Sequence, residues 1–198
     1  MSIVLYENYI IGDDATITLY GAIWRGQTFT PSIAHTITSV KLLLLKTGSP
    51  GTLTVSIRAT TGGLPTGADL CSGTINGNAI TEDAAGVWYE ITLTGYNLSA
   101  STKYAIVVRA PSGDISNLVG WRHDITSPTY AGGDDASSSD SGVTWTSLGT
   151  RDRMFEEWGC VGITIACRIA FDSAPYAAIP IWDDITSDLR GFSIKKGR

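Results

Sequence analysis

Six large aromatic side chains are candidates for the flat platform on which a sugar ring stacks. A pyranose presents an apolar C–H face that packs against a π surface, and polar neighbours then fix its orientation. The candidates are Trp24, Trp88, Trp121, Tyr130, Trp145 and Trp158. Large aromatic side chains lie in a core more often than on a surface. The neighbouring residues in the sequence must therefore show whether each one is a core side chain or a surface platform.

Trp88 is the strongest of these candidates because of the strand expected to carry it. Segment 87–93 alternates with a period of two, which places Trp88 on the polar face beside Glu90. The inward face of this segment is predicted to consist of Val87, Tyr89, Ile91 and Leu93. A second candidate is the run Trp121–Asp124, where an aromatic ring, a guanidinium, an imidazole and a carboxylate follow one another at loop or strand-end positions. The predicted sugar-binding residues are therefore Trp88, Glu90, Trp121, Arg122 and His123.

The sequence carries no motif for a known catalytic apparatus. It contains no Gly-x-Ser-x-Gly elbow, no His-Glu-x-x-His and no phosphate-binding loop. Glu156 and Glu157 are adjacent, so in a strand they face opposite ways and cannot flank one glycosidic bond. The chain is predicted not to be an enzyme, and a paired-carboxylate glycosidase or lyase is the alternative left open.

Metal ligands are also sparse. His35 and His123 are the only histidines, which is too few convergent ligands for a zinc site. Calcium takes loop carboxylates and backbone oxygens, but a solvated acidic loop is the preferred interpretation. The carboxylates considered for calcium are Glu7, Asp13, Asp14, Asp134, Asp135 and Asp140. No cofactor is predicted.

Charge and cysteine content narrow the class of protein. The 198 residues carry a net charge of −5, which argues against nucleic acid as a partner. No apolar run reaches the length of a membrane span, and the first residues do not resemble a secretory signal. Three cysteines without disulfide-type spacing are predicted to be buried thiols; they are Cys71, Cys160 and Cys167.

Alternating segments separated by turn residues predict an all-β fold. Segments 53–58 and 103–109 each place three apolar side chains on one face, whereas 40–45 is apolar on both faces apart from Lys41. The spacing of Tyr104 after Leu98 is typical of a tyrosine corner. Asp134–Gly142 is predicted to be a polar loop. Residues 1–172 are predicted to form the β-sandwich and 173–198 a C-terminal extension.

Several short motifs follow one another along the chain: Gly26–Pro31, Ile37–Leu45, Leu53–Arg58, Gly62–Gly67, Tyr104–Val108, Tyr130–Gly133, Ser141–Trp145 and Asp152–Phe155. Their order resembles a jelly-roll domain of bacterial surface and phage proteins, of the choice-of-anchor type. This resemblance implies an antiparallel jelly-roll β-sandwich, similar to carbohydrate-binding modules, with fold roles for Tyr130 and Trp145.

A second resemblance lies at the C-terminal end. Ile181–Arg198 is similar to a segment of tail proteins of long-tailed phages, in which a β-rich domain follows. The two resemblances imply a non-enzymatic virion protein of the tail, located in the virion and expected to form a homo-oligomer. Its partners would be other virion subunits and host surface glycans.

Two alternatives remain open. One is a carbohydrate-binding module of a bacterial surface protein or of a secreted glycan-degrading protein. The other is a purely structural capsid or tail decoration protein that has no ligand.

Overall fold

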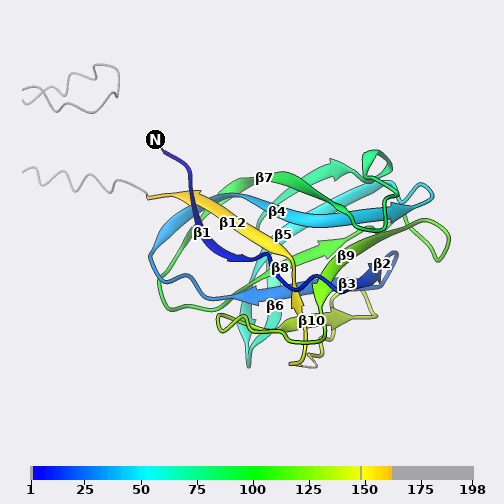
Figure 1. Cartoon of the computed structure of the whole chain (residues 1–198). Coiled ribbons are helices and arrows are strands. Elements are labelled where there is room, and N and C mark those ends of the chain that lie inside the picture. The colour runs from blue at the N-terminus through cyan, green and yellow to red at the C-terminus, as the bar shows by residue number, and fades with distance from the viewer. Residues whose placement is uncertain (1, 148, 162–198) are drawn as a thin grey trace, which may run out of the picture. The chain divides into compact units, whose positions relative to one another are not determined.

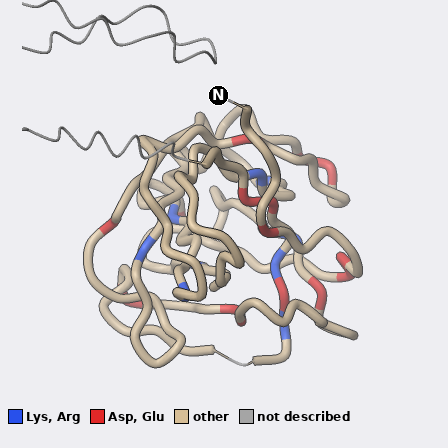
Figure 2. The backbone as a smooth tube through the Cα atoms, turned by 90° about the vertical axis from the view of Figure 1, so that its left-hand side faces the viewer, with Lys and Arg blue, Asp and Glu red and all other residues tan. Residues whose placement is uncertain are grey.

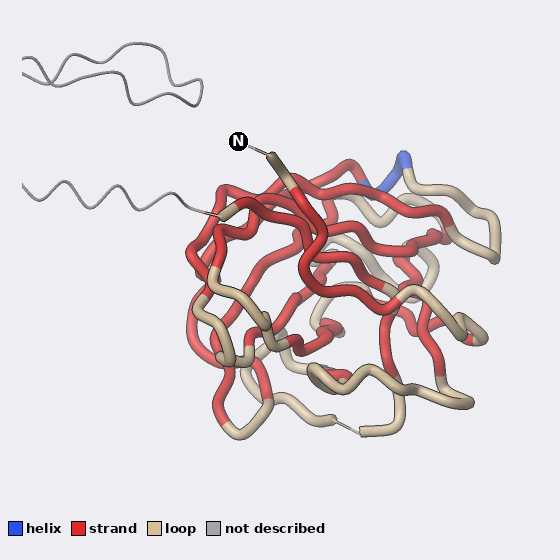
Figure 3. Tube along the Cα trace, turned by 60° about the vertical axis from the view of Figure 1, so that its left-hand side comes forward, coloured by secondary structure: helices blue, strands red, loops and turns tan. Residues whose placement is uncertain are grey.

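The computed structural model describes residues 2–147 and 149–161, and these residues form two antiparallel sheets. Strands dominate the described chain, and a short 3-10 turn, η1 (Gly77–Ala79), is the helical element within it (Figure 3). The strands are β1 (Val4–Tyr9), β2 (Ala15–Leu19), β3 (Trp24–Phe29), β4 (His35–Thr47), β5 (Thr52–Thr61), β6 (Leu64–Asn76), β7 (Val87–Leu98), β8 (Tyr104–Arg109), β9 (Leu118–Asp124), β10 (Asp135–Ser138), β11 (Asp152–Arg153) and β12 (Phe155–Cys160).

The long strand β4 is the centre of the seven-stranded sheet. It pairs with β7 along one edge, and with β12 and then β9 along the other. Strands β1 and β2 continue the sheet beyond β12 and β9 (Figure 1). The apolar run 40–45 therefore lies in a central strand, as its lack of a polar face predicts.

The five-stranded sheet has the order β10-β3-β8-β5-β6. Within it, four adjacent strands follow the order β3-β8-β5-β6, and four adjacent strands of the other sheet follow the order β2-β9-β4-β7. The chain therefore passes from one sheet to the other between most consecutive strands. Two interlocked Greek keys of this kind define a jelly roll. The predicted all-β, antiparallel jelly-roll β-sandwich is confirmed.

The core fills the space between the sheets. The alternating segments contribute as predicted: Leu53, Val55 and Ile57 of β5 are fully buried and belong to one core cluster with Leu42 of β4 and Ile91 of β7. Val87 is an exception, because it begins β7 at the end of the sheet and is 45% exposed. The largest fully buried side chains include Trp121, Phe29, Phe155, Leu42, Ile91 and Ile106.

The connection between β7 and β8 is a tyrosine corner. The backbone N–H of Ser99 donates a hydrogen bond to the buried Tyr104 hydroxyl at 3.1 Å. This bond ties the start of β8 to the end of β7, where the chain crosses from one sheet to the other. The structural role predicted for Tyr104 is confirmed.

One local expectation is wrong, and another lies outside the described residues. Asp134–Gly142 is not loop throughout, because Asp135–Ser138 pairs with β3 as strand β10. The predicted boundary at residues 172 and 173 falls beyond Val161, where the described chain ends.

Two of the three cysteines are described, and both are buried free thiols. Burial raises the pKa of Cys71 to about 11, so its reactive thiolate form is disfavoured at neutral pH. Cys167 lies outside the described residues. Nowhere in residues 2–147 and 149–161 is there a helix with the length and apolar character that a membrane crossing requires.

Candidate functional site

Trp88 and Glu90 share the outer face of the seven-stranded sheet, as their alternation predicts. Trp88 is half-buried and lies opposite Leu43 of β4, whereas Glu90 is exposed and lies opposite Lys41. The Glu90 carboxylate accepts a hydrogen bond from the Ser39 hydroxyl at 2.8 Å. The side chain of Glu90 is therefore anchored at the surface of the sheet.

A second tryptophan lies on this face beyond Lys41. Lys41 is opposite Glu156 of β12, and its Nζ lies 3.6 Å from the Glu156 carboxylate and 4.6 Å from the centre of the Trp158 ring. The Trp158 indole N–H donates to Glu156 at 2.7 Å. We call the set Lys41, Trp88, Glu90, Glu156 and Trp158 the tryptophan face.

The tryptophan face combines two half-buried indoles with three charged groups on rigid strands. An indole ring offers an apolar surface to the C–H face of a sugar, and carboxylates and ammonium groups bond its hydroxyls. Because β12, β4 and β7 are hydrogen-bonded neighbours, the spacing of these side chains is held by the sheet. The arrangement suits recognition of a neutral or weakly basic glycan.

Lys41 was missing from the candidates that the sequence suggested. A signal for it exists, because it is the one charged residue in the apolar run 40–45. A lysine within a central strand must turn its ammonium group out of the sandwich. Its partners Glu156 and Trp158 are more than a hundred residues away in the chain, so their proximity could not be anticipated.

The run 121–123 does not form a surface site, and this part of the prediction is wrong. Trp121 is fully buried, and its indole N–H donates to the Met154 carbonyl at 2.8 Å. His123, two residues on, also points inward, whereas Arg122 turns outward and bonds Asp13. Successive strand residues face opposite sides, so these three side chains cannot share one surface.

His123 lies in a charged environment inside the sandwich. Burial, followed by the positive charge of Arg153, lowers the pKa of His123 to about 4, so the imidazole is neutral at pH 7. Its Nδ1 lies 3.5 Å from the Arg153 guanidinium. A neutral, enclosed imidazole of this kind contributes to the core and is inaccessible to a sugar.

Tyr130 and Trp145 both make contacts within the fold. Tyr130 packs edge-on against Phe155, with ring centres 5.2 Å apart, and its hydroxyl donates to Glu7 at 3.0 Å. Trp145 lies next to Gly26 on the outer side of the five-stranded sheet. Its indole N–H donates to the Gly142 carbonyl at 3.1 Å, which braces the surrounding loop.

The acidic residues considered for calcium are used in separate local contacts. Glu7 accepts from Tyr130 and Asp14 from the Ile125 N–H, on different parts of the fold. Hydrogen bonds led by those from Thr144 lower the pKa of Asp140 to about 2. Within the described part of the chain, no three His, Cys, Asp or Glu side chains come together as a metal site.

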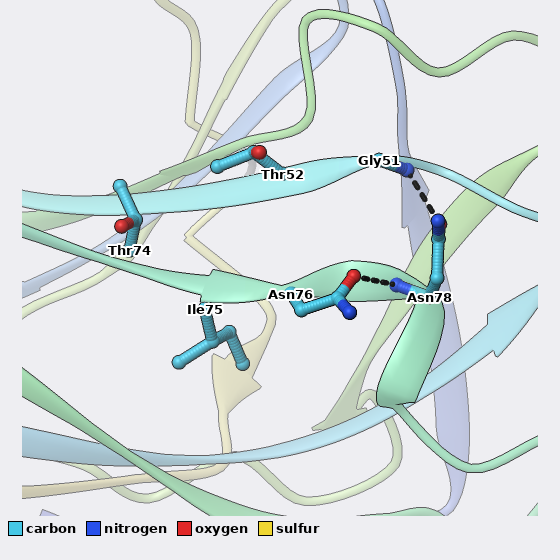
Figure 4. A pocket seen from close by; sticks show the side chains of 6 residues that line it. All are labelled: Gly51, Thr52, Thr74, Ile75, Asn76 and Asn78. Carbon is cyan, nitrogen blue, oxygen red and sulfur yellow. Dashed lines mark hydrogen bonds between the residues drawn. The ribbon is translucent and has the colours of Figure 1, made fainter.

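Two shallow depressions lie away from the tryptophan face. The first, of about 310 Å³, is lined by Gly51, Thr52, Thr74, Ile75, Asn76 and Asn78 (Figure 4). Figure 4 shows its two asparagines turned to backbone groups: Asn78 accepts from Gly51 N–H and Asn76 from Asn78 N–H. The second, of about 470 Å³, is lined by Thr36, Thr94, Gly95, Tyr96 and Asn97. Neither depression is lined by a charged side chain.

Comparison with known proteins supports the fold alone. No known family matches the sequence, and no curated protein does. The chain is similar in structure to the crystal structure of the cysteine protease and lectin-like domains of Cwp84, a surface layer associated protein of Clostridium difficile, with a TM-score of 0.54 and 12% identity. The match covers 80% of this chain and 36% of that one, so this chain spans about a third of the neighbour's length.

Proposed function

We propose that this chain is a non-enzymatic glycan-binding β-sandwich and that the tryptophan face is its binding surface. The observation that carries the proposal is that two half-buried indoles, Trp88 and Trp158, share one sheet face with Lys41, Glu90 and Glu156. A lectin-like domain in the structural neighbour agrees with this use of the fold.

The absence of catalysis is part of the same proposal. Of the adjacent carboxylates, Glu157 faces inward and bonds His35 at 2.8 Å, whereas Glu156 faces outward and bonds Trp158. The outward Glu156 carboxylate is engaged by the Trp158 indole N–H and lies 3.6 Å from Lys41 Nζ, so its charge is used in local contacts. These contacts support binding without turnover.

We place the protein in a phage virion, associated with the tail, where it binds host surface glycans or packs against neighbouring subunits. This setting rests on the resemblance of Ile181–Arg198 to phage tail proteins, a segment outside the described residues. Subunit packing has support in the sandwich itself. Edge strand β1 and the residue before it expose the apolar side chains of Ile3 (55%), Val4 (42%) and Leu5 (38%), which suits burial of this edge against a protein neighbour.

The second candidate is a carbohydrate-binding module of a bacterial surface or secreted protein. The observation that favours it is the structural neighbour, which is a surface-layer associated protein. Nucleic acid is not proposed as a partner, because acidic and basic residues are interspersed over the described chain and form no basic block (Figure 2).

Glycan-array binding tests the proposal. The labelled full chain should bind a set of bacterial surface oligosaccharides, and Trp88→Ala should weaken this at least about tenfold, or ~1.4 kcal/mol. The control is Ile115→Ala, an exposed apolar residue in the β8–β9 connection. Binding that survives both Trp88→Ala and Trp158→Ala would remove the tryptophan face as the site. Absence of any glycan binding, together with ordered self-assembly, would favour the decoration protein.

A further inference from the structure

A cluster of two arginines and a tryptophan lies on the outer face of the other, five-stranded sheet. Four strands that are neighbours in the sheet contribute one residue each: β3 Trp24, β8 Arg109, β5 Arg58 and β6 Asp69. The guanidinium groups of Arg58 and Arg109 lie 5.3 Å and 5.0 Å from the centre of the Trp24 ring. We call these four residues the arginine cluster.

The cluster carries one more positive than negative charge. Asp69 accepts from Arg109 Nη2 at 2.5 Å and from Arg58 Nε at 2.8 Å, and Arg109 Nη1 also donates to Ser56. Burial opposes ionisation of Asp69, but the hydrogen bonds from Arg109 and Arg58 outweigh it and hold the pKa of that carboxyl below its usual value. Two guanidinium cations therefore share a single carboxylate.

Arg58 keeps unused hydrogen-bond donors at the surface of this cluster. Among the described residues it donates through Nε alone, which leaves the N–H groups of Nη1 and Nη2 for solvent or a ligand. Its side chain is 12% exposed, so the stem and most of the guanidinium are already ordered by the sheet, Asp69 and Trp24. Ordering it on binding therefore costs little entropy.

A loop with an unusual backbone forms the wall beside Arg58. Ser141 and Gly142 have φ angles of 61° and 80°. Residues other than glycine seldom adopt a positive φ such as that of Ser141. A Cβ added at Gly142 would lie 3.3 Å from Arg58 Nη1 and would collide with the Trp24 ring. The loop is pinned by the Ser141 N–H, which donates to the Ala22 carbonyl. The left-handed backbone thus lets the loop approach both side chains closely.

We propose that the arginine cluster binds the carboxylate of an acidic sugar, such as a uronic acid residue of a glycan. The planar fork of Arg58 matches a carboxylate, and the excess positive charge favours an anion in a chain whose net charge is −5. The half-buried Trp145 beside Gly26 provides apolar ring surface for the pyranose, whereas Trp24 carries the two guanidinium groups. The choice of a sugar as the molecule that carries the carboxylate rests on the proposed glycan-binding function. The arginine cluster itself lies on the other sheet from the tryptophan face.

Calorimetry with a defined pair of probes tests this site. A trimeric oligogalacturonate should bind the full chain, and its carboxyl-reduced form, which has the same rings without the charge, should bind at least tenfold more weakly. Arg58→Gln should lower affinity for the acidic form at least tenfold, and Arg58→Lys should restore only part of it because the fork is lost. The matched control is Arg122→Gln, an arginine paired with Asp13 on the other sheet.

Several results would overturn the inference. One is equal binding of the acidic and reduced trimers, and another is unchanged affinity of Arg58→Gln for the acidic trimer. A third is acetate binding as tightly as the acidic trimer, which would show that the sugar ring adds nothing to the affinity. If the Arg58 variants do not fold, the indole N–H signals of the wild-type protein decide: the acidic trimer should shift Trp24 and Trp145 and leave Trp88 unmoved. Shifts confined to Trp88 would contradict this site and support the tryptophan face, so the two proposals fail separately.

Discussion

At the scale of single residues, His35 of β4 and Glu157 of β12 form an ionisable pair that is fully enclosed. Both side chains have no exposed surface, and His35 Nε2 lies 2.8 Å from Glu157 Oε1. Tyr6 stacks on the imidazole with ring centres 3.6 Å apart. The second carboxylate oxygen, Glu157 Oε2, is buried without a hydrogen bond among the described residues. A pair held this tightly keeps its proton more readily than either group would in water.

The direction of the pKa shifts makes the stability of the fold pH-dependent. Burial opposes the charged form of His35, but hydrogen bonds to Glu157 and the Ile33 carbonyl outweigh it and raise the pKa of His35 above 6.5. Burial raises the pKa of Glu157 above 4.5, and His35 offsets only part of this. In both cases the folded state binds the proton more tightly, so stability is greatest below the unfolded pKa and falls as pH rises through the folded pKa.

Replacing Glu157 by Gln should flatten this dependence. The wild-type free energy of unfolding should decline as the pH rises above 6.5, by ~1.4 kcal/mol for each unit by which the pKa of His35 is raised. Glu157→Gln keeps a hydrogen-bonding partner for His35 but removes the charge that raises its pKa. Urea unfolding at each pH measures both curves. A variant curve parallel to that of the wild type would show that the pair does not control the slope.

At the scale of elements, the tyrosine corner shows how one hydroxyl secures a crossover between sheets. Tyr104→Phe should lower the free energy of unfolding by about 1–3 kcal/mol, because the Ser99 N–H loses its partner. Chemical denaturation measures the loss. The control is Tyr20→Phe, since the Tyr20 hydroxyl makes no hydrogen bond with the other described residues and should be near neutral. Equal effects at the two positions would mean that ring packing, and not the corner, matters at Tyr104.

The elements that the sequence predicts are those that a local pattern specifies. Alternation gives the inward faces of β5 and β8 because side chains on a strand change sides at every residue. The same rule, applied to 121–123, already separates Arg122 from its two neighbours, so the proposed surface run was inconsistent with a strand. Strand β10 escaped detection because its four residues are Asp, Ala, Ser and Ser, which have no apolar side to alternate.

At the scale of the whole molecule, the two candidate sites show what one sequence cannot reveal. Each is assembled from side chains on neighbouring strands that are distant in the chain: Asp69 and Arg109 are forty residues apart, and Lys41 and Glu156 more than a hundred. No local spacing encodes these approaches. These contacts between distant residues follow from the order of strands in each sheet. The alternation of apolar and polar residues within a single strand does not specify that order.

Arg153 joins the two sheets and carries the last prediction. It extends from β11 of the seven-stranded sheet to the Gly26 and Ala136 carbonyls of the five-stranded sheet, at 2.9 Å and 3.3 Å, and lies 3.5 Å from Asp135. The guanidinium is fully buried. Such a group is held in place only because its donors are bonded, and removing it leaves the buried Asp135 charge without this counter-ion.

Arg153→Met keeps the length and apolar stem of the side chain, so its effect should come from the lost charge and hydrogen bonds. It should cost about 3–5 kcal/mol of stability, against at most about 1 kcal/mol for Arg122→Met at a surface pair. The pKa of His123 should also rise from about 4 in the folded variant, because a nearby positive charge is removed while burial remains. Urea unfolding gives the first quantity and NMR titration of the imidazole the second. A stability loss with an unmoved pKa of His123 would mean that burial alone keeps the imidazole neutral and that the charge of Arg153 acts only on the joint between the sheets.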